Sequence, residues 1–197
     1  MRIISVKRAI IILLVIGIMV VVSGCVRYPG PKPEPPDPDY QLEITVEVEG
    51  NIDSGLADEG IYYVGINPLG DTEPGPDSDL DYWRNKFYYI KLDNSGCYLY
   101  SKDVSASPIL LNNCSYNNGN ELKIIFFLSN LGVLETSIDV NVVTADSSNG
   151  VYDYLDDCIN ISTSSLYTTE EGISSINLDE DEADYDIIKT SVEITNI

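Results

Sequence analysis

Three carboxylates alternate along a short acidic segment of the chain. Asp77, Asp79 and Asp81 are separated by single residues, in a stretch rich in Gly, Pro and Asp. Calcium takes six to eight oxygen ligands and tolerates irregular geometry, so such a loop can wrap around the ion. An EF-hand is excluded, because Tyr82 and Tyr88 stand where that motif needs glycine and glutamate. We therefore expect either a calcium site of another type at the three aspartates or a solvated loop.

Aromatic side chains gather around this acidic segment. Nine of the eighteen aromatic residues lie between Tyr62 and Tyr100. Tyrosine and tryptophan combine an apolar ring face with a polar group, which suits stacking against sugar rings. Tyr82 and Trp83 lie next to the acidic segment and are our candidates for glycan binding. The alternative is that these rings fill the core or the rim of a sheet, since strands are rich in aromatic residues.

Cys97, Cys114 and Cys158 are the cysteines found beyond the N-terminal region. Asn, Ser and Pro between Cys97 and Cys114 can fold the chain back, so we expect this pair to form a disulfide. The alternative is three buried free thiols, because free cysteine is among the most buried residue types. The chain has no histidine, which excludes histidine-activated nucleophiles and zinc sites that contain histidine. No other nucleophile motif is present, so we expect no enzyme activity.

The chain is strongly acidic. It has 32 Asp and Glu residues against 11 Lys and Arg, a net charge of −21. Such a field repels phosphate backbones and anionic lipid headgroups, which excludes nucleic acid as a partner. Cations and neutral ligands are compatible with it. The run DEDEAD at residues 179–184 is expected to be a solvated loop.

The N-terminus has the order of a secretory signal peptide. Basic residues come first, at Arg2, Lys7 and Arg8, and an apolar run of fourteen residues follows at 9–22. This run is shorter than the roughly 20 apolar residues that a membrane-spanning helix needs. The segment is therefore expected to be a cleaved signal and not an anchor helix.

The end of this segment resembles the lipobox of bacterial lipoproteins. Val22, Ser23 and Gly24 precede Cys25, as an aliphatic residue and two small residues precede the lipidated cysteine of that family. The resemblance implies cleavage after Gly24, a lipid on Cys25, and a location outside the cytoplasm, anchored to the cell membrane or the outer membrane. Two or more acyl chains give stable anchoring. Cleavage would leave 8 basic residues against 32 acidic ones, a net charge of −24.

A proline-rich segment follows Cys25. Residues 26–39 hold six of the ten prolines, and proline favours an extended backbone without hydrogen bonds. At about 3.1 Å per residue, this spacer can span about 40 Å. The chain is thus expected to contain a signal peptide at 1–24, a lipidated cysteine with its spacer at 25–39, and one folded domain at 40–197.

The folded part shows the short patterns of β-strands. Apolar and polar residues alternate over 42–49, 138–142 and 188–195, and apolar or aromatic runs occupy 61–66, 87–92, 97–101 and 122–128. We expect 122–128 to be the most buried strand, 145–185 to be mostly loop with short strands near 158–161, and residues 93–96 to form a hairpin turn. The pattern predicts an all-β fold with a single antiparallel β-sandwich, jelly-roll-like, whose two end strands pair.

The order of these segments resembles the DOMON-like and family-9 carbohydrate-binding-module-like sandwiches. The resemblance rests on five features: the tyrosine-rich strand at 61–67, the acidic Gly-Pro loop after it, an aromatic strand, Leu131-Gly132 at the end of a later strand, and residues 140–146. Some members of that group bind sugars and some bind haem. Haem does not suit this chain, because histidine is missing and both methionines precede Cys25.

Taken together, the sequence predicts an extracytoplasmic lipoprotein whose domain binds or scaffolds and does not catalyse. The alternative is a carbohydrate-binding module that serves a polysaccharide uptake or degradation system. The expected partners are the membrane, through the lipid, and either a glycan or envelope proteins. The one cofactor that the sequence suggests is calcium, at Asp77, Asp79 and Asp81.

Overall fold

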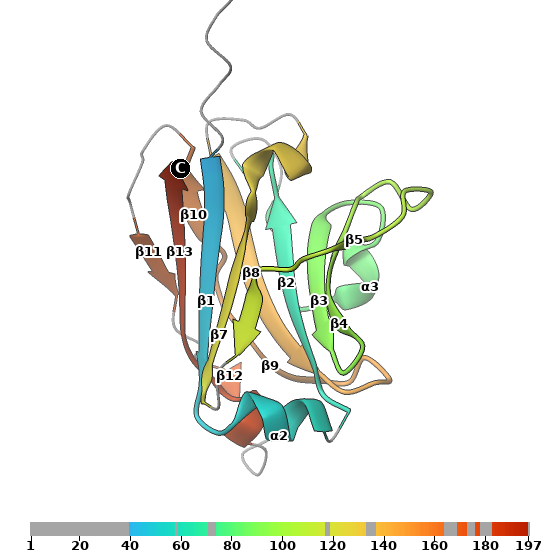
Figure 1. Ribbon diagram of the computed structural model, residues 1–197, viewed down its shortest axis with the longest axis vertical. Helices are drawn as coiled ribbons and strands as arrows, with labels where there is room; N and C mark the ends of the chain where they lie inside the picture. Colours follow the sequence, from blue (N-terminus) through green and yellow to red (C-terminus); the bar gives the residue numbers. More distant parts are fainter. Residues whose placement is uncertain are drawn as a thin grey trace, which may run out of the picture. The chain divides into compact units, whose positions relative to one another are not determined.

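Two antiparallel β-sheets pack face to face in this protein (Figure 1). The computed structural model describes residues 40–57, 59–70, 74–116, 119–132, 137–163, 169–172, 176–177 and 183–196. Within these ranges, one sheet has five strands and the other has eight. The predicted all-β sandwich is confirmed.

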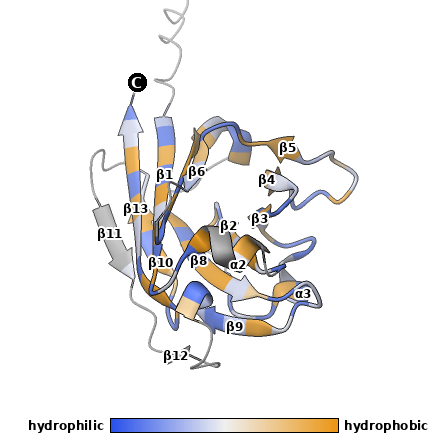
Figure 2. Ribbon diagram, turned by 60° about the horizontal axis from the view of Figure 1, so that its bottom comes forward, coloured by the Kyte–Doolittle hydropathy of each residue, from blue (hydrophilic) through white to orange (hydrophobic). Residues whose placement is uncertain are grey.

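The five-stranded sheet brings the two ends of the described chain together. Its strands, in spatial order, are β11 (Thr169–Gly172), β13 (Ile187–Asn196), β1 (Tyr40–Val48), β7 (Glu121–Phe127) and β6 (Cys114–Tyr116). β1 and β13 pair along their length, with Tyr40 opposite Asn196. The predicted pairing of the end strands is therefore confirmed, and Figure 2 shows apolar and polar residues alternating along both.

The eight-stranded sheet carries the hairpin that the sequence predicts. Its strands are β12 (Ile176–Asn177), β9 (Val151–Tyr154), β8 (Ser137–Ala145), β2 (Ile61–Asn67), β3 (Tyr88–Asp93), β4 (Gly96–Tyr100) and β5 (Ile109–Leu110), with β10 (Ile159–Ser162) also paired to β8. β3 and β4 meet at a turn in which Asp93 lies opposite Gly96. Gly96 has a φ of +131°, a backbone conformation that side chains disfavour.

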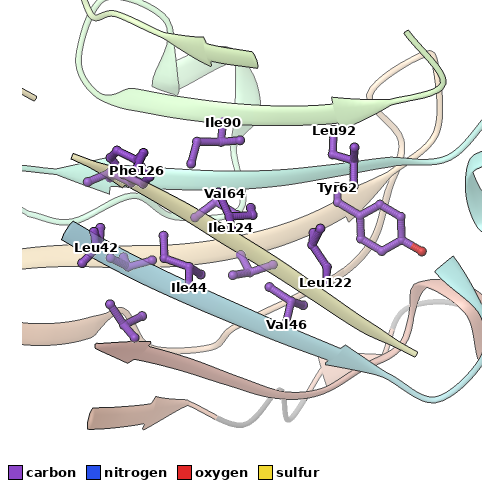
Figure 3. Close-up of a cluster of buried hydrophobic side chains, with 14 of the residues drawn as sticks. Leu42, Ile44, Val46, Tyr62, Val64, Ile90, Leu92, Leu122, Ile124 and Phe126 are labelled. Carbon is purple, nitrogen blue, oxygen red and sulfur yellow. The ribbon is translucent and has the colours of Figure 1, made fainter. Parts of the chain in front are cut away.

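The main core lies between the two sheets. Figure 3 shows side chains of β1 and β7 meeting those of β2 and β3 across the interface: Leu42, Ile44, Val46, Leu122, Ile124, Phe126, Tyr62, Val64, Ile90 and Leu92. Each of these side chains is at most 4% exposed. Because successive residues of a strand point to opposite faces, the residues between them form the outer faces of the sheets.

The most buried strands are β2 and β8, and the prediction that 122–128 would be the most buried is wrong. Every residue of β2 and of β8 is buried, whereas burial alternates along β7. The reason is that loops cover the outer face of the eight-stranded sheet. Asn141 on β8, for example, donates through its side-chain amide to the carbonyls of Pro76 and Leu155.

Four short helical segments complete the described structure: α2 (Ile52–Ala57), α3 (Leu80–Trp83), and the 3-10 turns η1 (Leu128–Leu131) and η2 (Ala183–Tyr185). α2 and η2 close one end of the sandwich (Figure 1). The Tyr185 hydroxyl donates to the Gly55 carbonyl at 2.7 Å, and the Tyr62 hydroxyl donates to the Asp184 carbonyl at 2.6 Å. Asp184 ends the acidic run at 179–184, so this residue belongs to a packed turn, while residues 179–182 lie outside the described ranges.

Candidate ligand-binding site

Trp83, the only tryptophan of the chain, is packed onto the outer face of the eight-stranded sheet. It is 1% exposed, and its indole N–H donates to the Asp77 carbonyl at 2.8 Å. It belongs to a second apolar cluster, with Ile61, Tyr63, Phe87, Val143 and Ala145. A ring can approach the sheet this closely because Gly65 lies beneath it: a Cβ at that position would be 2.8 Å from the indole ring.

Three tyrosines form a row beside Trp83. Tyr63, Tyr89 and Tyr100 come from β2, β3 and β4 and lie on the outer face of the sheet. Tyr89 and Tyr100 are direct cross-strand partners, and their rings stack with centroids 4.7 Å apart and planes 2° apart. Tyr63 lies 6.5 Å from Tyr89 and stands edge-on to Trp83, also at 6.5 Å. Three strands thus place three tyrosine rings next to Trp83 of α3.

A pocket of about 180 Å³ opens among these rings. Its lining combines aromatic, cationic and amide groups, from Tyr63, Leu80, Trp83, Arg84, Tyr89, Lys91, Tyr100 and Asn149. The exposed surface of this lining is more polar than apolar, so the pocket suits a ligand that carries hydrogen-bonding groups. Its volume suits one small ring and not a large cofactor, since drug-sized ligands occupy pockets of roughly 300–1,000 Å³.

Two cationic side chains line this pocket in an otherwise acidic domain. Lys91 is held by Asp93, with its amino group 2.7 Å from the carboxylate. Arg84 is the only arginine after residue 27. Within the described ranges the ion pairs are Lys91–Asp93 and Lys123–Glu43, so no described carboxylate pairs with Arg84. Its guanidinium therefore offers hydrogen-bond donors to a ligand.

The hydroxyls of Tyr63 and Tyr89 at the pocket stay protonated. Burial raises the pKa of Tyr63 above its ordinary value, and Lys91 partly opposes this. Burial also raises the pKa of Tyr89, with Tyr100 as the next cause. Near neutral pH these groups therefore remain neutral hydroxyls that can both donate and accept hydrogen bonds.

The loop after β8 supplies the amide at the pocket rim. The Asp146 carboxylate accepts from the Ser148 N–H, the Ser148 hydroxyl and the Gly150 N–H, each at 2.7 Å. These hydrogen bonds lower the pKa of Asp146 and hold the loop closed. Asn149 adopts a left-handed φ of 67° in this loop, and its Oδ1 accepts from the Tyr63 hydroxyl at 3.2 Å.

The two aromatic residues predicted as ligand contacts are placed differently. Trp83 lines the pocket but is buried, as the alternative interpretation of the sequence expects. Tyr82 is 46% exposed and does not line the pocket. The Lys86 amino group lies 3.7 Å from the centroid of the Tyr82 ring, a cation–π contact. The structure therefore brings Trp83, but not Tyr82, to the candidate site.

The aspartates predicted to bind calcium lie in the loop before α3. Asp77 accepts the Asp79 N–H at 3.0 Å, and Asp79 accepts the Asp81 N–H at 3.2 Å, which caps the helix. All three residues are exposed. The described ranges contain no group of three or more Cys, Asp or Glu side chains that could hold a metal ion. The calcium site stays a prediction for which this structure shows no formed set of ligands.

The three cysteines are free thiols in this structure. Cys97 lies on β4 and Cys114 on β6, so the predicted disulfide partners belong to opposite sheets. The two thiols are hydrogen bonded, and this contact, together with burial, raises the pKa of Cys97. Cys158 lies elsewhere, and its thiol donates to the Pro76 carbonyl at 2.9 Å. Burial raises the pKa of Cys158 to about 11, which disfavours the reactive thiolate at neutral pH.

Sequence reasoning named the aromatic region but missed most of the residues that line the pocket: Tyr63, Leu80, Arg84, Tyr89, Lys91, Tyr100 and Asn149. A usable signal was present in the predicted hairpin. A turn at residues 93–96 places Tyr89 opposite Tyr100 and, by alternation, on the same face as Lys91. The position of Arg84 depends on how the loop folds over the sheet, which no local pattern indicates.

Comparisons with protein families, with curated proteins and with solved structures find no match for this chain. The resemblances to lipoproteins and to family-9-like sandwiches thus stay predictions. Cys25 and the rest of 1–39 lie outside the described residues. None of the helices in the described ranges has the length and apolar character needed to cross a membrane.

Proposed function

We propose that this protein is a non-catalytic, extracytoplasmic binding domain, anchored through a lipid on Cys25, whose aromatic pocket holds one ring of a glycan. The observation that carries the proposal is the pocket itself. Stacked Tyr89 and Tyr100 form part of its wall, and an arginine without a described ion partner stands at the same pocket. The sequence supports the anchor, because Cys25 follows a signal-like segment and precedes a proline-rich spacer.

The side chains of the pocket match the two kinds of surface that a sugar presents. The C–H face of a sugar ring is apolar and packs against tyrosine rings. Sugar hydroxyls need donors and acceptors, which Arg84, Lys91 and Asn149 provide. An apolar ligand would cover the Arg84 guanidinium without offering it a hydrogen-bond acceptor, at a cost to affinity.

The same lining favours binding over hydrolysis. Glycoside hydrolysis generally needs two carboxyl groups on either side of the scissile bond. None of the residues that line the aromatic pocket is Asp or Glu. The domain would therefore retain a glycan for another protein to process or take up.

Tryptophan fluorescence tests this proposal directly, because Trp83 is the only tryptophan and lines the pocket. The full chain, extracted in detergent, is titrated with glucose, xylose, mannose and N-acetylglucosamine oligosaccharides. We expect one series to shift the emission of Trp83. Tyr100→Ala should weaken that binding about tenfold, since it removes a ring from the pocket wall.

Tyr98→Ala is the matched control. Tyr98 lies on the same strand as Tyr100, two residues away, and does not line the pocket. Its removal should leave glycan affinity unchanged. Unchanged emission with every series, or equal affinities for the Tyr98 and Tyr100 variants, would overturn the proposal and leave scaffolding as the function to pursue.

A further inference from the structure

A second hollow lies beside the aromatic pocket on the same face of the sheet. It has a volume of about 270 Å³ and is lined by Glu59, Gly60, Ile61, Lys91, Asp93, Asn94 and Ser147. Lys91 lines both hollows. The loop after β8 also reaches both, because Asn149 lines the aromatic pocket and Ser147 lines the second hollow.

The two hollows follow one another along β3. Tyr89 lines the first, Lys91 lines both, and Asp93 lines the second. At about 3.3 Å per residue, the outer face of β3 spans about 13 Å from Tyr89 to Asp93. On the neighbouring strand β2, Tyr63 lies opposite Lys91, and Ile61 continues toward the second hollow. The outer faces of β2 and β3 therefore both lead from the aromatic pocket to the second hollow.

The chemistry changes along this path. The first hollow has four aromatic rings, whereas the second has none and is lined by two carboxylates, an amide, a hydroxyl, the Lys91 amino group and the apolar Ile61. At the junction, Asp93 neutralises Lys91 through the 2.7 Å ion pair. Asp93 also accepts the Ser95 N–H at 2.8 Å, so its position is fixed by the hairpin turn. A neutral, hydroxyl-rich chain can pass this junction without meeting an uncompensated charge.

Unusual backbone conformations accompany both hollows. The non-glycine residues with positive φ in the described ranges are Glu59, Asn85 and Asn149. Glu59 lines the second hollow, Asn149 lines the first, and Asn85 follows Arg84. Left-handed backbone is costly for residues other than glycine and persists where the surrounding structure holds it, often at binding sites. The surrounding structure thus holds the backbone in a defined conformation at the rim of each hollow, at Glu59 and at Asn149.

We infer that the ligand is a chain of linked sugars that lies along β3 with one ring in each hollow. This inference rests on the proposed function and deepens it, since it names a disaccharide or longer oligosaccharide as the ligand class. The aromatic hollow stacks one ring. The second hollow hydrogen-bonds the hydroxyls of the next ring through Asn94, Ser147 and the nearby carboxylates.

The test compares ligand lengths and variants in the full chain. Monomer, dimer and trimer of the glucose, xylose, mannose and N-acetylglucosamine series are titrated against Trp83 emission and by calorimetry. The dimer should bind about tenfold more tightly than the monomer, because it adds several hydrogen bonds. Asn94→Ala and Ser147→Ala should each weaken dimer binding about threefold to tenfold and leave monomer binding unchanged.

Asn112→Ala is the matched control, since Asn112 is exposed and lines neither hollow. Equal affinities for monomer and dimer, or unchanged dimer affinity in both second-hollow variants, would overturn the two-ring arrangement while leaving the aromatic site in place. If no sugar binds, or if Tyr100→Ala has no effect, the proposed function fails and this inference fails with it.

Discussion

At the scale of single residues, the candidate site depends on Gly65 as much as on the rings that line it. Gly65 allows Trp83 and Pro76 to rest directly on β2, and Trp83 in turn forms the wall that faces Tyr63. The sequence left two interpretations of Trp83 open, a ring that stacks on a glycan or a ring of the core or the sheet rim. In the structure Trp83 supports the pocket as a buried ring, because its indole N–H donates to the Asp77 carbonyl and its ring is 1% exposed.

Gly65→Ala should destabilise the protein and disturb the pocket. The new Cβ would lie 2.8 Å from both the Trp83 ring and the Pro76 side chain, and overpacking of this kind costs about 1–3 kcal/mol. Urea denaturation measures the loss, and a shifted Trp83 emission in the folded state should accompany it. In a Trp83→Leu background the same substitution should cost less. An equal cost in both backgrounds would show that Trp83 is not the residue displaced.

Cys158 should be a slow nucleophile whose reactivity rises only at high pH. Burial raises its pKa to about 11, and Asp139, Asp157 and Asp77 act in the same direction, while a hydrogen bond from Asn141 opposes it. At pH 8 the thiolate fraction should be on the order of a hundredfold below that of an exposed cysteine with a pKa near 8.5.

Iodoacetamide labelling of a Cys97→Ser, Cys114→Ser variant, followed by mass spectrometry across a pH series, isolates the Cys158 reaction. The rate should keep rising toward pH 11. A plateau reached near pH 9 would contradict the raised pKa and reopen the question of a reactive thiol. A short cysteine peptide measured in parallel gives the reference rate.

At the scale of elements, the hairpin and the end strands could be predicted because their determinants are local. Alternation in β1 and β13 identifies their inner faces, and residues 93–96 identify the turn. The burial of β8 could not be predicted in this way. The alternation in the sequence predicts that Asp139 and Asn141 face solvent. They are 6% and 2% exposed, because the chain folds over them. Coverage of a sheet by a distant loop leaves no periodic pattern in either segment.

A disulfide between Cys97 and Cys114 should lock the two sheets together. The two thiols already touch, one on β4 and the other on β6. Oxidised glutathione supplies the oxidant: the two thiols form one S–S bond, and each disulfide reagent leaves as two reduced glutathione molecules. Closing so short a loop should stabilise the fold by about 3 kcal/mol.

Thermal unfolding before and after oxidation measures this gain, and peptide mapping identifies the bond. Cys158→Ser is the control and should keep the full increase, whereas Cys97→Ser should abolish it. Both Cys97 and Cys114 found free after oxidation would instead favour the alternative of buried free thiols. A mixed product that includes Cys158 would mean that the cross-sheet contact does not select the pair.

At the scale of the whole molecule, charge is the dominant feature. The chain carries a net charge of −21. The described ranges contain two ion pairs, Lys91–Asp93 and Lys123–Glu43. Mutual repulsion among surface carboxylates opposes the compact state, and salt screens it. Such a surface also repels anionic lipid headgroups, which is compatible with the proposed anchoring of the domain through a spacer.

Screening and specific calcium binding predict different responses to ions. The melting temperature should rise when sodium chloride is added to the protein in chelator. Calcium and magnesium at matched ionic strength should give similar rises, because the Asp77 and Asp79 carboxylates accept backbone N–H groups and the described residues around these two and Asp81 form no set of metal ligands. Any ion bound only by the folded state adds its own increment by mass action. An excess rise with calcium over magnesium that disappears in Asp79→Ala would therefore contradict this expectation and establish the calcium site that the sequence predicts.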